Sequence, residues 1–550
     1  MRRFSVVPLA GSDLHSSGTV VFPGVRNLAR QVGVTRYPGN MMSDDQDHNL
    51  DLTQWIEVEA APDGRILAGV VGEDRVFVWR SGNRLKAYSA DCPHLGGPLD
   101  EGIIAAGATI RCPWHHACFD LATGEATAAP AFDALLEYPV TFDNDRFCVK
   151  PAHVQTPRRT GRREDGPGTM AIVGGGAAGF AAADAIRKLG WRGGVTIFSA
   201  EREQPYDRTL LTKDYLEGSF GDDRLPIARH SLTDLGVDFE SDESVRQVDP
   251  GNKRLRLANG DERPYEKLLL ATGATPRRLD VPGADLPHVM VLRSLQDCRR
   301  ILAKAISGTR VAVVGGSFIA MEAAASLIGR VLSVDVIAPE EHPLEKVFGR
   351  ELSDLVLEAH SRKGVRLHLG AKVARIEDKQ VALQGGERID ADLVVVGIGV
   401  EPCLQLAEAA GLALDRGVLV NSWLQTSDPD IFAAGDIARW PDPHTGESIR
   451  VEHWVVAERQ GQVAAANMLG GDQPFVMVPF FWTKHFDLSI RYVGHAEKWD
   501  ETLVEGDLEH RNGLVRFRRA GRDLAVATVE RDKDSLRAEL AMEGESQRSS

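Results

Sequence analysis

A strand, a glycine-rich turn and a helix follow one another twice in this chain, and this pattern constrains the fold more than any other feature. In the first copy, an apolar run at residues 171–173 enters a turn with Gly174, Gly176 and Gly179, which opens a segment of helical apolar period. Such a turn lets the backbone approach a pyrophosphate at the N-terminus of a helix. The same order recurs from residue 311 to residue 328. The sequence therefore predicts two doubly wound α/β domains that each bind a dinucleotide.

Two short stretches ahead of these domains each pair a cysteine with a histidine. The first is Cys92-x-His94, and seventeen residues further on the second is Cys112-x-x-His115. In a Rieske [2Fe–2S] cluster two thiolates hold one iron, and two neutral imidazoles replace the thiolates on the other. A structural zinc site also takes two cysteines and two histidines, but its ligand pairs are usually separated by two or more residues. We therefore predict a Rieske cluster held by Cys92, His94, Cys112 and His115, with zinc as the alternative.

The size, charge and cysteine content of the chain limit its function class. With 550 residues it is too long for one core and suggests roughly three or four domains. The net charge of −15 and the scattered basic residues argue against binding to nucleic acid phosphates. No apolar run approaches the ~20 residues that cross a bilayer, and six dispersed cysteines are too few for a disulfide scaffold. We expect a soluble, cytoplasmic protein with no nucleic-acid partner and no membrane span.

The first 50 residues show no sustained helix or strand pattern. Met41 and Met42 directly precede an acidic, patterned segment, so we expect translation to begin near Met41. A targeting peptide is the alternative, since residues 1–40 hold five arginines and one acidic residue, Asp13. Prolines and glycines in that stretch, however, interrupt any amphipathic helix.

Changes in pattern divide the chain into domains. Short β-type runs before residue 151 indicate an all-β domain, and an Arg-, Pro- and Gly-rich stretch follows it. Strands and helices then alternate until β-type runs return after residue 478. The predicted parts are a disordered or non-native extension at 1–50, the all-β iron–sulfur domain at 51–151, a linker at 152–168, the first dinucleotide-binding domain at 169–290 and 411–476, the second at 291–410, a C-terminal α+β domain at 477–540 and a disordered tail at 541–550.

Four further features accompany the first glycine turn in a fixed order. An acidic residue lies past the second strand, and a basic stretch, an Ala-Thr-Gly turn and an Ala-Gly-Asp turn follow. They are Glu201, Arg208 with Lys213, Thr272 with Gly273, and Gly435 with Asp436. This order resembles the pyridine-nucleotide-dependent flavoprotein reductases over residues 169–500, in the branch of the oxygenase-linked ferredoxin reductases and apoptosis-inducing-factor-like proteins. Residues 52–151 resemble the Rieske ferredoxins.

The resemblance implies an FAD site in the first α/β domain. The implied contacts are Gly174, Gly176 and Gly179 with the pyrophosphate, Glu201 with the adenosine ribose, Arg208 and Lys213 with the pyrophosphate or flavin, Asp436 with the ribityl chain, and Glu452, His453, Trp454 and Trp482 with the isoalloxazine. Core packing is the alternative for each aromatic residue. Residues 206–216 lack the cysteine pair of disulfide-reducing relatives, so reduction of a disulfide is not expected.

In the second α/β domain the resemblance implies a nicotinamide coenzyme. The turn there departs from the ideal, since Ser317 and Ala320 stand where the second and third glycines belong. A carboxylate past the second strand, with no arginine or lysine cluster, would repel a 2′-phosphate, so we expect NADH rather than NADPH. The implied coenzyme residues are Gly315, Ile319, Glu322, Glu340 and Gly399.

The resemblance also bears on the cluster itself. High-potential Rieske proteins join the two loops by a disulfide, and those positions are Gly97 and Trp114 here. Ala117 stands where such proteins often offer a hydroxyl. Fewer hydrogen bonds to the sulfurs predict a potential toward the low end of the Rieske range. His116 and Cys118 fall outside the ligand spacing, and we expect a polar residue at the rim and a free thiol.

An electron-transfer enzyme is the function that the resemblance implies, from NADH through FAD to the Rieske cluster and on to an oxygenase, a cytochrome or a ferredoxin. No side chain acts as nucleophile or acid, because the cofactors carry the chemistry. The linker is expected to let the iron–sulfur domain visit the flavin and then the acceptor, with the exposed imidazole edges of His94 and His115 as the exit.

The main alternative is a redox sensor or interaction protein of the apoptosis-inducing-factor type with slow NADH turnover. An oxygenase in its own right is not expected, because no histidine pair with a carboxylate stands outside the loops. Whether the chain forms a homodimer is left open.

Overall fold

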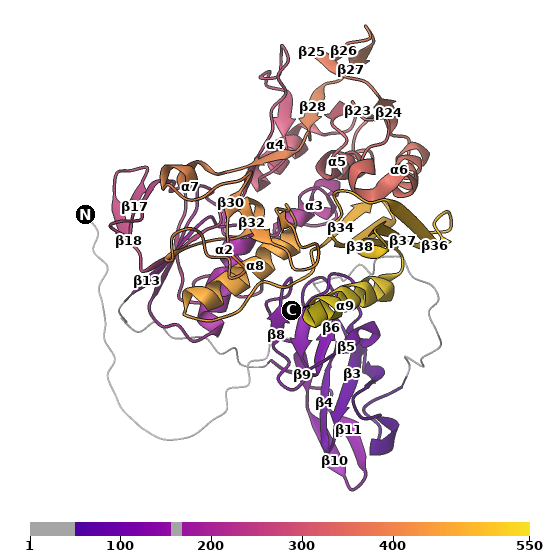
Figure 1. The fold of residues 1–550 in the computed structure, drawn as a ribbon. Helices are drawn as coiled ribbons and strands as arrows, with labels where there is room; N and C mark the ends of the chain where they lie inside the picture. Colours follow the sequence, from indigo (N-terminus) through magenta and orange to yellow (C-terminus); the bar gives the residue numbers. More distant parts are fainter. Residues whose placement is uncertain (1–49, 156–167, 550) are drawn as a thin grey trace, which may run out of the picture. The chain divides into compact units, whose positions relative to one another are not determined.

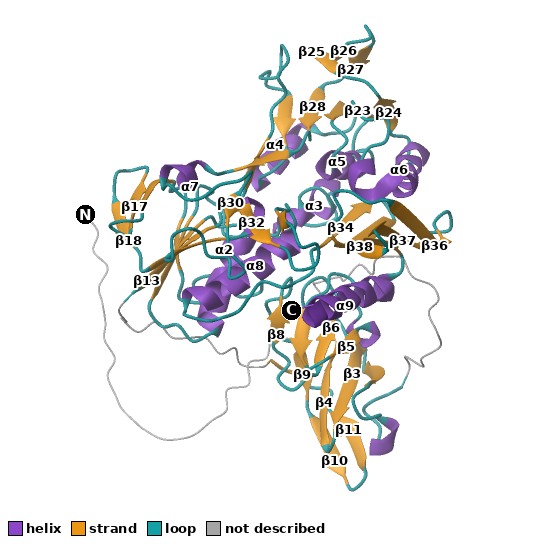
Figure 2. Ribbon diagram, viewed as in Figure 1, coloured by secondary structure: helices purple, strands orange, loops and turns teal. Residues whose placement is uncertain are grey.

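The structure is a computed structural model that describes residues 50–155 and 168–549 (Figure 1). Predictions made for residues 1–49, for linker residues 156–167 and for residue 550 lie outside the described residues. Within the described part, strands are the main regular elements of the N-terminal domain, and helices alternate with strands afterwards (Figure 2). This is the predicted fold class: an all-β domain, two α/β domains and a C-terminal α+β domain.

The N-terminal domain consists of three antiparallel sheets, with strand orders β12-β9-β4-β3-β2, β1-β11-β10 and β5-β6-β7-β8. Phe77, Tyr88 and Phe119 are buried in its core. Val154 and Gln155, predicted as linker, form a strand because they pair with β9. The strands are β1 Ile56–Glu57, β2 Ile66–Val71, β3 Asp74–Ser81, β4 Arg84–Ser89, β5 Ile103–Ala105, β6 Thr109–Arg111, β7 Cys118–Asp120, β8 Ala126–Ala128, β9 Leu136–Tyr138, β10 Val140–Asp143, β11 Arg146–Val149 and β12 Val154–Gln155.

The first α/β domain is built on a parallel sheet in the order β15-β14-β13-β19-β31. Helices α2 and α8 cross closely, because Gly461 has no Cβ, which would otherwise lie 2.2 Å from the Ala178 carbonyl oxygen. The elements are β13 Thr169–Val173, α2 Ala177–Lys188, β14 Gly194–Phe198, α3 Asp214–Glu217, β15 Asp238–Glu240, β16 Val245–Asp249, β17 Arg254–Leu257, β18 Glu262–Pro264, β19 Lys267–Leu270, β20 Ala274–Pro276, β30 Val418–Leu419, β31 Ile431–Ala433, β32 Ala438–Pro441, β33 Ser448–Ile449 and α8 Trp454–Met468.

The second α/β domain repeats this plan with a parallel sheet in the order β21-β28-β22-β23-β24. Its first helix, α4, begins with a capping box in which Ser294 and Asp297 satisfy each other's backbone N–H groups. The elements are β21 Val289–Val291, α4 Leu295–Lys304, β22 Arg310–Val314, α5 Phe318–Leu327, β23 Ser333–Ala338, α6 Glu345–Arg362, β24 Arg366–Leu369, β25 Val373–Glu377, β26 Gln380–Leu383, β27 Arg388–Asp390, β28 Leu393–Val396, β29 Val400–Pro402 and α7 Gln405–Ala409.

The C-terminal domain is an antiparallel sheet in the order β34-β35-β38-β37-β36, followed by helix α9. The helix continues to Ser549, so the prediction of a disordered tail over residues 541–550 is wrong for residues 541–549. Met542 is buried against the sheet, so the contact between helix α9 and the sheet continues to this residue. The elements are β34 Phe480–His485, β35 Leu488–Gly494, β36 Glu501–Asp507, β37 Asn512–Arg519, β38 Arg522–Val529 and α9 Asp532–Ser549.

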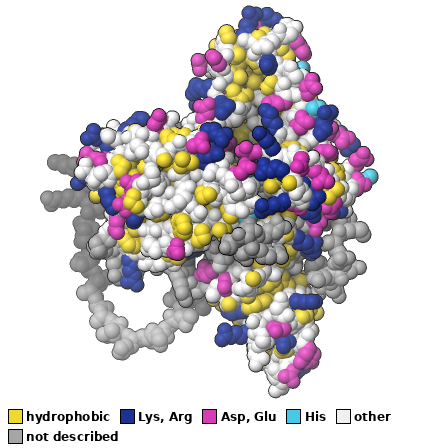
Figure 3. Space-filling view, viewed as in Figure 1, with side chains coloured by type: hydrophobic (Ala, Val, Ile, Leu, Met, Phe, Trp, Pro, Cys, Tyr) yellow, Lys and Arg dark blue, Asp and Glu magenta, His cyan; other side chains and the backbone are white. Residues whose placement is uncertain are grey.

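Charges of both signs are interspersed on the face drawn in Figure 3. Some of the charged side chains in the described residues pair with each other: Asp523 lies 2.7 Å from Arg516 and 2.9 Å from Arg518. Among the helices that the structure describes, none is both long and apolar enough to cross a membrane.

Candidate functional site

The two Cys–His loops share one backbone geometry. The Cys92 carbonyl accepts a hydrogen bond from the N–H of Gly96 at 2.8 Å, and the Cys112 carbonyl accepts one from His116 at 3.1 Å. Each cysteine N–H also donates to the carbonyl five residues on, at 2.9 Å in both loops. A Cβ on Gly97 would lie 2.7 Å from the Cys112 sulfur, so a glycine lets the loops approach each other.

The four predicted ligands form two pairs across these loops, one of histidines and one of cysteines. The rings of His94 and His115 lie edge to face with centroids 5.0 Å apart, and the buried thiols of Cys92 and Cys112 lie within hydrogen-bonding reach of each other. Burial lowers the pKa of His94 to about 3 and holds the pKa of His115 well below its usual value. Both imidazoles are therefore neutral, which is the form that binds iron. Two adjacent thiols and two adjacent neutral imidazoles fit a Rieske cluster.

The imidazoles face the rest of the chain and not solvent. The His94 side chain is 7% exposed, and its Nε2 lies 3.9 Å from Asp207 Oδ2. The His115 ring packs against the indole of Trp482, with centroids 4.2 Å apart. The prediction of exposed imidazole edges as the exit is therefore wrong, because the FAD-side domain and the C-terminal sheet cover them.

The neighbours of the ligands also differ from expectation. His116 is fully buried and not at a polar rim: its Nδ1 lies 2.9 Å from a Glu539 carboxylate oxygen, and its ring stacks on Phe480 with centroids 3.9 Å apart. Cys118 is a buried free thiol, and burial raises its pKa to about 11. Glu539 and Phe480 lie more than 360 positions further along the chain than His116, so no local sequence pattern predicts these contacts.

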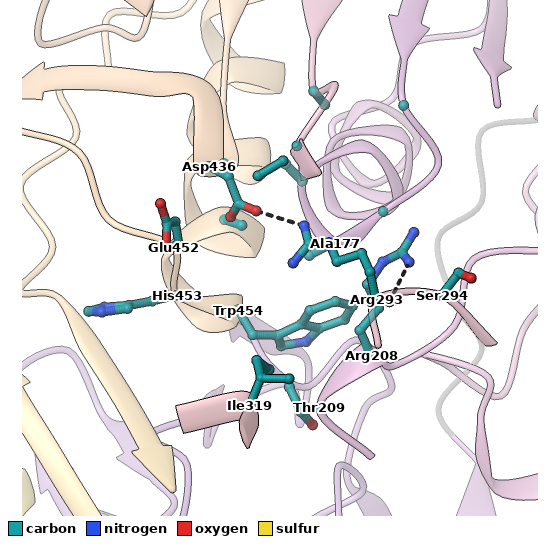
Figure 4. Close-up of a pocket in the computed structure, with 18 of the residues that line it drawn as sticks. Ala177, Arg208, Thr209, Arg293, Ser294, Ile319, Asp436, Glu452, His453 and Trp454 are labelled. Atoms are coloured by element: carbon teal, nitrogen blue, oxygen red, sulfur yellow. Dashed lines mark hydrogen bonds and ion pairs between the residues drawn. The ribbon is translucent and has the colours of Figure 1, made fainter. Parts of the chain in front are cut away.

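A cleft of about 770 Å³ is lined by residues of both α/β domains and of the C-terminal sheet (Figure 4). Its volume suits a large organic cofactor. Trp482, which was predicted to line the isoalloxazine, is one of its lining residues. The other predicted cofactor residues in its lining are Gly174, Gly176, Glu201, Arg208, Lys213, Thr272, Gly273, Ile319, Glu322, Gly435, Asp436, Glu452, His453 and Trp454.

The glycine turn at the cleft has the geometry that a phosphate site needs. Gly174 has φ of 119°, and a Cβ there would lie 2.0 Å from the Ala271 carbonyl oxygen. Gly176 has open space at its Cβ position, so its backbone is accessible from the cleft. Gly179 lies inside α2, where a Cβ would meet the Gly174 carbonyl oxygen at 1.9 Å, so its role is close packing of helix and turn. The turn therefore fits the pyrophosphate of FAD.

Two oppositely charged residues in the lining of the cleft, Glu201 and Arg208, contact each other. Glu201 accepts hydrogen bonds from the Tyr206 hydroxyl at 2.6 Å and from Arg208 at 2.5 Å. Glu201 and Arg208, predicted to contact the cofactor, thus form an ion pair with each other at the edge of the cleft.

A second arginine of the cleft, Arg293, was not predicted from the sequence. Arg293 Nη2 lies 2.8 Å from an oxygen of Asp436, and the Arg293 carbonyl accepts a hydrogen bond from Arg208 at 3.2 Å (Figure 4). Arg293 directly precedes Ser294, the N-cap of α4. The Ser-x-x-Asp capping signature there could have located this helix start, but not the partner of the arginine.

Lys213 and Glu322 form a buried group in the wall of the cleft. Glu322 accepts hydrogen bonds from Lys213 at 2.7 Å, from Thr212 at 2.5 Å and from Thr483 at 2.6 Å. These residues come from the segment before α3, from α5 and from β34. One carboxylate therefore joins three parts of the fold where the nicotinamide was expected.

The second glycine turn keeps its shape despite its two substitutions. Gly315 has φ of 121°. Ser317 caps α5 by accepting from the Ala320 N–H at 3.3 Å, and its hydroxyl donates to the Gly397 carbonyl at 2.6 Å. Gly397 leaves room for Ala320, whose Cβ would lie 2.9 Å from a Cβ at that position. The serine thus replaces the expected glycine with a side chain that stabilises the turn.

Three predicted coenzyme residues lie outside the lining of the cleft. Gly315, Glu340 and Gly399 follow strands β22, β23 and β28, at the carboxyl edge of the second sheet. A carboxylate oxygen of Glu340 is buried without a hydrogen-bond partner and faces Gly316, where a Cβ would lie 3.1 Å from it. An unpartnered acceptor beside the turn fits a ribose hydroxyl.

Comparison with known proteins agrees with this geometry. Residues 168–461, more than half of the chain, match the family described as pyridine nucleotide-disulphide oxidoreductase. The chain belongs to this family. Residues 54–139 match the Rieske [2Fe-2S] domain, and residues 480–549 match the reductase C-terminal family. The Rieske match favours the [2Fe–2S] cluster over zinc. This oxidoreductase therefore combines an FAD- and NAD-binding body with an iron–sulfur domain.

This oxidoreductase is similar in sequence to several known proteins. Apoptosis-inducing factor 3 of Mus musculus is 30% identical over 495 residues, which are 86% of this chain and 81% of that protein. The 5,5′-dehydrodivanillate O-demethylase ferredoxin reductase subunit of Sphingobium sp. is 36% identical over 66% of this chain and 90% of its own length. The ferredoxin–NAD(+) reductase component of the biphenyl dioxygenase system of Paraburkholderia xenovorans is 34% identical over 64% of this chain and 86% of its own.

Two solved structures are also similar to this chain in fold and in sequence. The covalent putidaredoxin reductase–putidaredoxin complex contains a chain with a TM-score of 0.66 and 29% identity, matched over 69% of this chain and 93% of that one. A ferredoxin reductase from Rhodopseudomonas palustris has a TM-score of 0.64 and 32% identity over 68% of this chain and 93% of its own.

Proposed function

We propose that this chain is an NADH-dependent reductase that passes electrons through FAD to its own Rieske cluster and on to an external protein acceptor. One observation carries the proposal. Trp482 lines the cleft, and its indole also packs against the cluster ligand His115, with ring centroids 4.2 Å apart. A single side chain thus connects the cleft with the iron–sulfur loops.

The residues of the chain bind and orient the cofactors. When bound, FAD takes up a hydride from NADH and releases the two electrons one at a time. The glycine turn at Gly174 would hold the pyrophosphate, and the Arg293–Asp436 pair would contact the ribityl chain. Ile319 on α5 and the Lys213–Glu322 pair form the wall at which the nicotinamide would dock. Orientation and electrostatics are the contributions of the protein.

The names of the relatives support a protein acceptor of the oxygenase type. Two of them are ferredoxin reductase components of an O-demethylase and of a biphenyl dioxygenase system. Those relatives align with about two thirds of this chain. A ferredoxin, a cytochrome or an oxygenase is the acceptor class that fits a chain with its own one-electron cluster.

A stopped-flow experiment tests this function. The full-length holoprotein is mixed with NADH without oxygen, and flavin and cluster absorbance are followed separately. The flavin should lose its oxidised band first, and the cluster should be reduced in a second phase. A flavin that is reduced while the cluster stays oxidised would refute the electron path.

We also propose a second candidate function, because apoptosis-inducing factor 3 aligns with 86% of this chain. An alignment of this length must include at least part of the iron–sulfur domain. A redox sensor of that type would turn NADH over slowly. Steady-state assays with ferricyanide and with cytochrome c separate the two: fast turnover with both supports the reductase, and slow turnover after rapid flavin reduction supports the sensor.

The location in the cell and the oligomeric state of the chain stay predictions. We expect the chain to act in the cytoplasm, which cell fractionation tests. A homodimer is tested by light scattering of the purified holoprotein over a range of concentrations.

A further inference from the structure

Helix α9 connects the iron–sulfur domain to the rest of the chain through one buried carboxylate. Glu539 is fully buried and accepts hydrogen bonds from Arg111 at 3.1 Å and from Arg459 at 2.8 Å. It also lies 2.9 Å from Nδ1 of His116. Arg111 and His116 belong to the iron–sulfur domain, and Arg459 belongs to α8. Three parts of the fold therefore share one carboxylate.

A second carboxylate of α9 reinforces this contact. Glu543 accepts hydrogen bonds from both terminal nitrogens of Arg111, at 3.0 and 2.7 Å, in a forked arrangement. Such two-point pairs fix direction as well as distance. In Figure 1, α9 lies beside β5 and β6 of the iron–sulfur domain, in agreement with these bonds. Separation of the two surfaces would leave buried charges without partners, which is strongly unfavourable.

The loop that carries His115 is held from both sides by arginines of other domains. Arg459 donates to the carbonyl of His116 at 2.8 Å, and Arg491 of β35 donates to the carbonyl of Trp114 at 3.0 Å. These carbonyls flank the cluster ligand. The ligand ring is thereby kept against Trp482.

An apolar contact lies on another side of the domain. Phe132 joins the core of the FAD-side domain and meets Phe180 of α2 edge to face, with centroids 5.1 Å apart. Lys188 donates to the Phe132 carbonyl at 3.0 Å, and Gln462 of α8 accepts from the Ala129 N–H at 3.1 Å. This side of the interface thus combines apolar packing with hydrogen bonds.

We propose that the iron–sulfur domain is docked permanently in this arrangement, fixed by Glu539, and that its cluster is reduced there without domain movement. The proposal rests on the proposed function above and replaces the expectation of a domain that swings on its linker. The surface around Trp482 is occupied by the chain's own iron–sulfur domain. A separate iron–sulfur protein then draws electrons from the cluster and not from the flavin.

The viscosity of the solvent tests the absence of movement in the unmodified holoprotein. Electron transfer between fixed groups does not require diffusion, whereas a swinging domain must move through solvent. The rate of cluster reduction after mixing with NADH should stay constant as sucrose raises the viscosity. A rate that falls in proportion to viscosity would overturn the proposal.

Charge reversal tests the contact itself. Arg111→Glu should slow cluster reduction by about ten- to a hundredfold, as expected when a redox partner is displaced, and should leave flavin reduction by NADH unchanged. The double variant Arg111→Glu/Glu543→Arg should recover part of the rate, because the pair between positions 111 and 543 is restored with opposite signs while Glu539 still lacks its arginine. Arg146→Glu, at the exposed Arg146–Asp143 pair of the same domain, is the matched control and should behave as the unmodified chain.

Hydrogen exchange shows whether the domain has left its place. Residues 112–118 and α9 should exchange faster in Arg111→Glu, while the core strand β3 stays protected. The milder Glu543→Gln covers the case in which charge reversal unfolds the domain, and a smaller change of the same sign is expected. Unchanged exchange and unchanged rates in these variants would overturn the docking proposal. Failure of NADH to reduce the flavin or the cluster in the unmodified chain would instead overturn the proposed function.

Discussion

The carboxylate of Glu322 lies 2.7 Å from the ammonium of Lys213 in the wall of the cofactor cleft. Glu322 is almost fully buried and also accepts hydrogen bonds from Thr212 and Thr483. A buried carboxylate with three donors keeps its position and neutralises the lysine beside it. This pair fixes the side of the cleft at which α5 meets the flavin-side domain.

Glu322→Gln should therefore lower both stability and the rate of flavin reduction. The substitution leaves Lys213 without its negative partner, and breaking a buried pair costs about 3 kcal/mol. Thermal unfolding and stopped-flow flavin reduction measure the two effects. Glu351→Gln, an exposed carboxylate on α6, should change neither. Unchanged unfolding and unchanged flavin reduction in Glu322→Gln would show that the pair contributes little.

Trp482 is expected to set the rate between flavin and cluster. Trp482→Ala removes the ring between the cleft and His115, so cluster reduction should slow by about tenfold, equivalent to ~1.4 kcal/mol of barrier. Trp482→Phe retains an aromatic ring and should lose less. Stopped-flow traces separate this phase from flavin reduction.

A control is needed because Trp482 also supports the C-terminal sheet. Trp499→Ala removes a tryptophan of the same domain that packs on Phe517, with ring centroids 5.0 Å apart. If Trp499→Ala slows cluster reduction as much as Trp482→Ala, the effect comes from lost packing and not from the path through the indole.

Loss of one cluster ligand should uncouple the two halves of the reaction. Cys112→Ser should abolish the Rieske signal in electron paramagnetic resonance and should retain reduction of ferricyanide by NADH through the flavin. Cys148→Ser changes another buried cysteine of the same domain and should retain the cluster. A Rieske signal that survives in Cys112→Ser would contradict the ligand assignment.

The local features of the site could be predicted from the sequence, because short segments determine them. The Cys–His loops and the turn at Gly174 need only a few adjacent residues, and the structure pairs His94 with His115 and Cys92 with Cys112 across the two loops. The same holds for the helix that follows each glycine turn. Their geometry follows from backbone constraints within about ten residues.

The contacts between domains could not be predicted in this way. Arg293 and its partner Asp436 are 143 positions apart, and His116 and Ser535, which share a hydrogen bond, are 419 positions apart. The residues next to His116 in the sequence do not show whether its side chain is exposed at a rim or buried in a core. Only the packing of α9 against the iron–sulfur domain decides that it is buried.

Glu340 should determine the preference for NADH. Its unpartnered carboxylate oxygen beside Gly316 can accept from a ribose hydroxyl and would repel a 2′-phosphate. Glu340→Ala should lower kcat/KM for NADH by about tenfold, the effect of losing one hydrogen bond to a charged group, and should raise kcat/KM for NADPH. Glu341→Ala removes the neighbouring exposed carboxylate and is the control. Because both variants lose one negative charge, a shift of the NADH to NADPH ratio in Glu340→Ala alone would assign the preference to this contact, whereas an equal shift in both would assign it to the general charge of the edge.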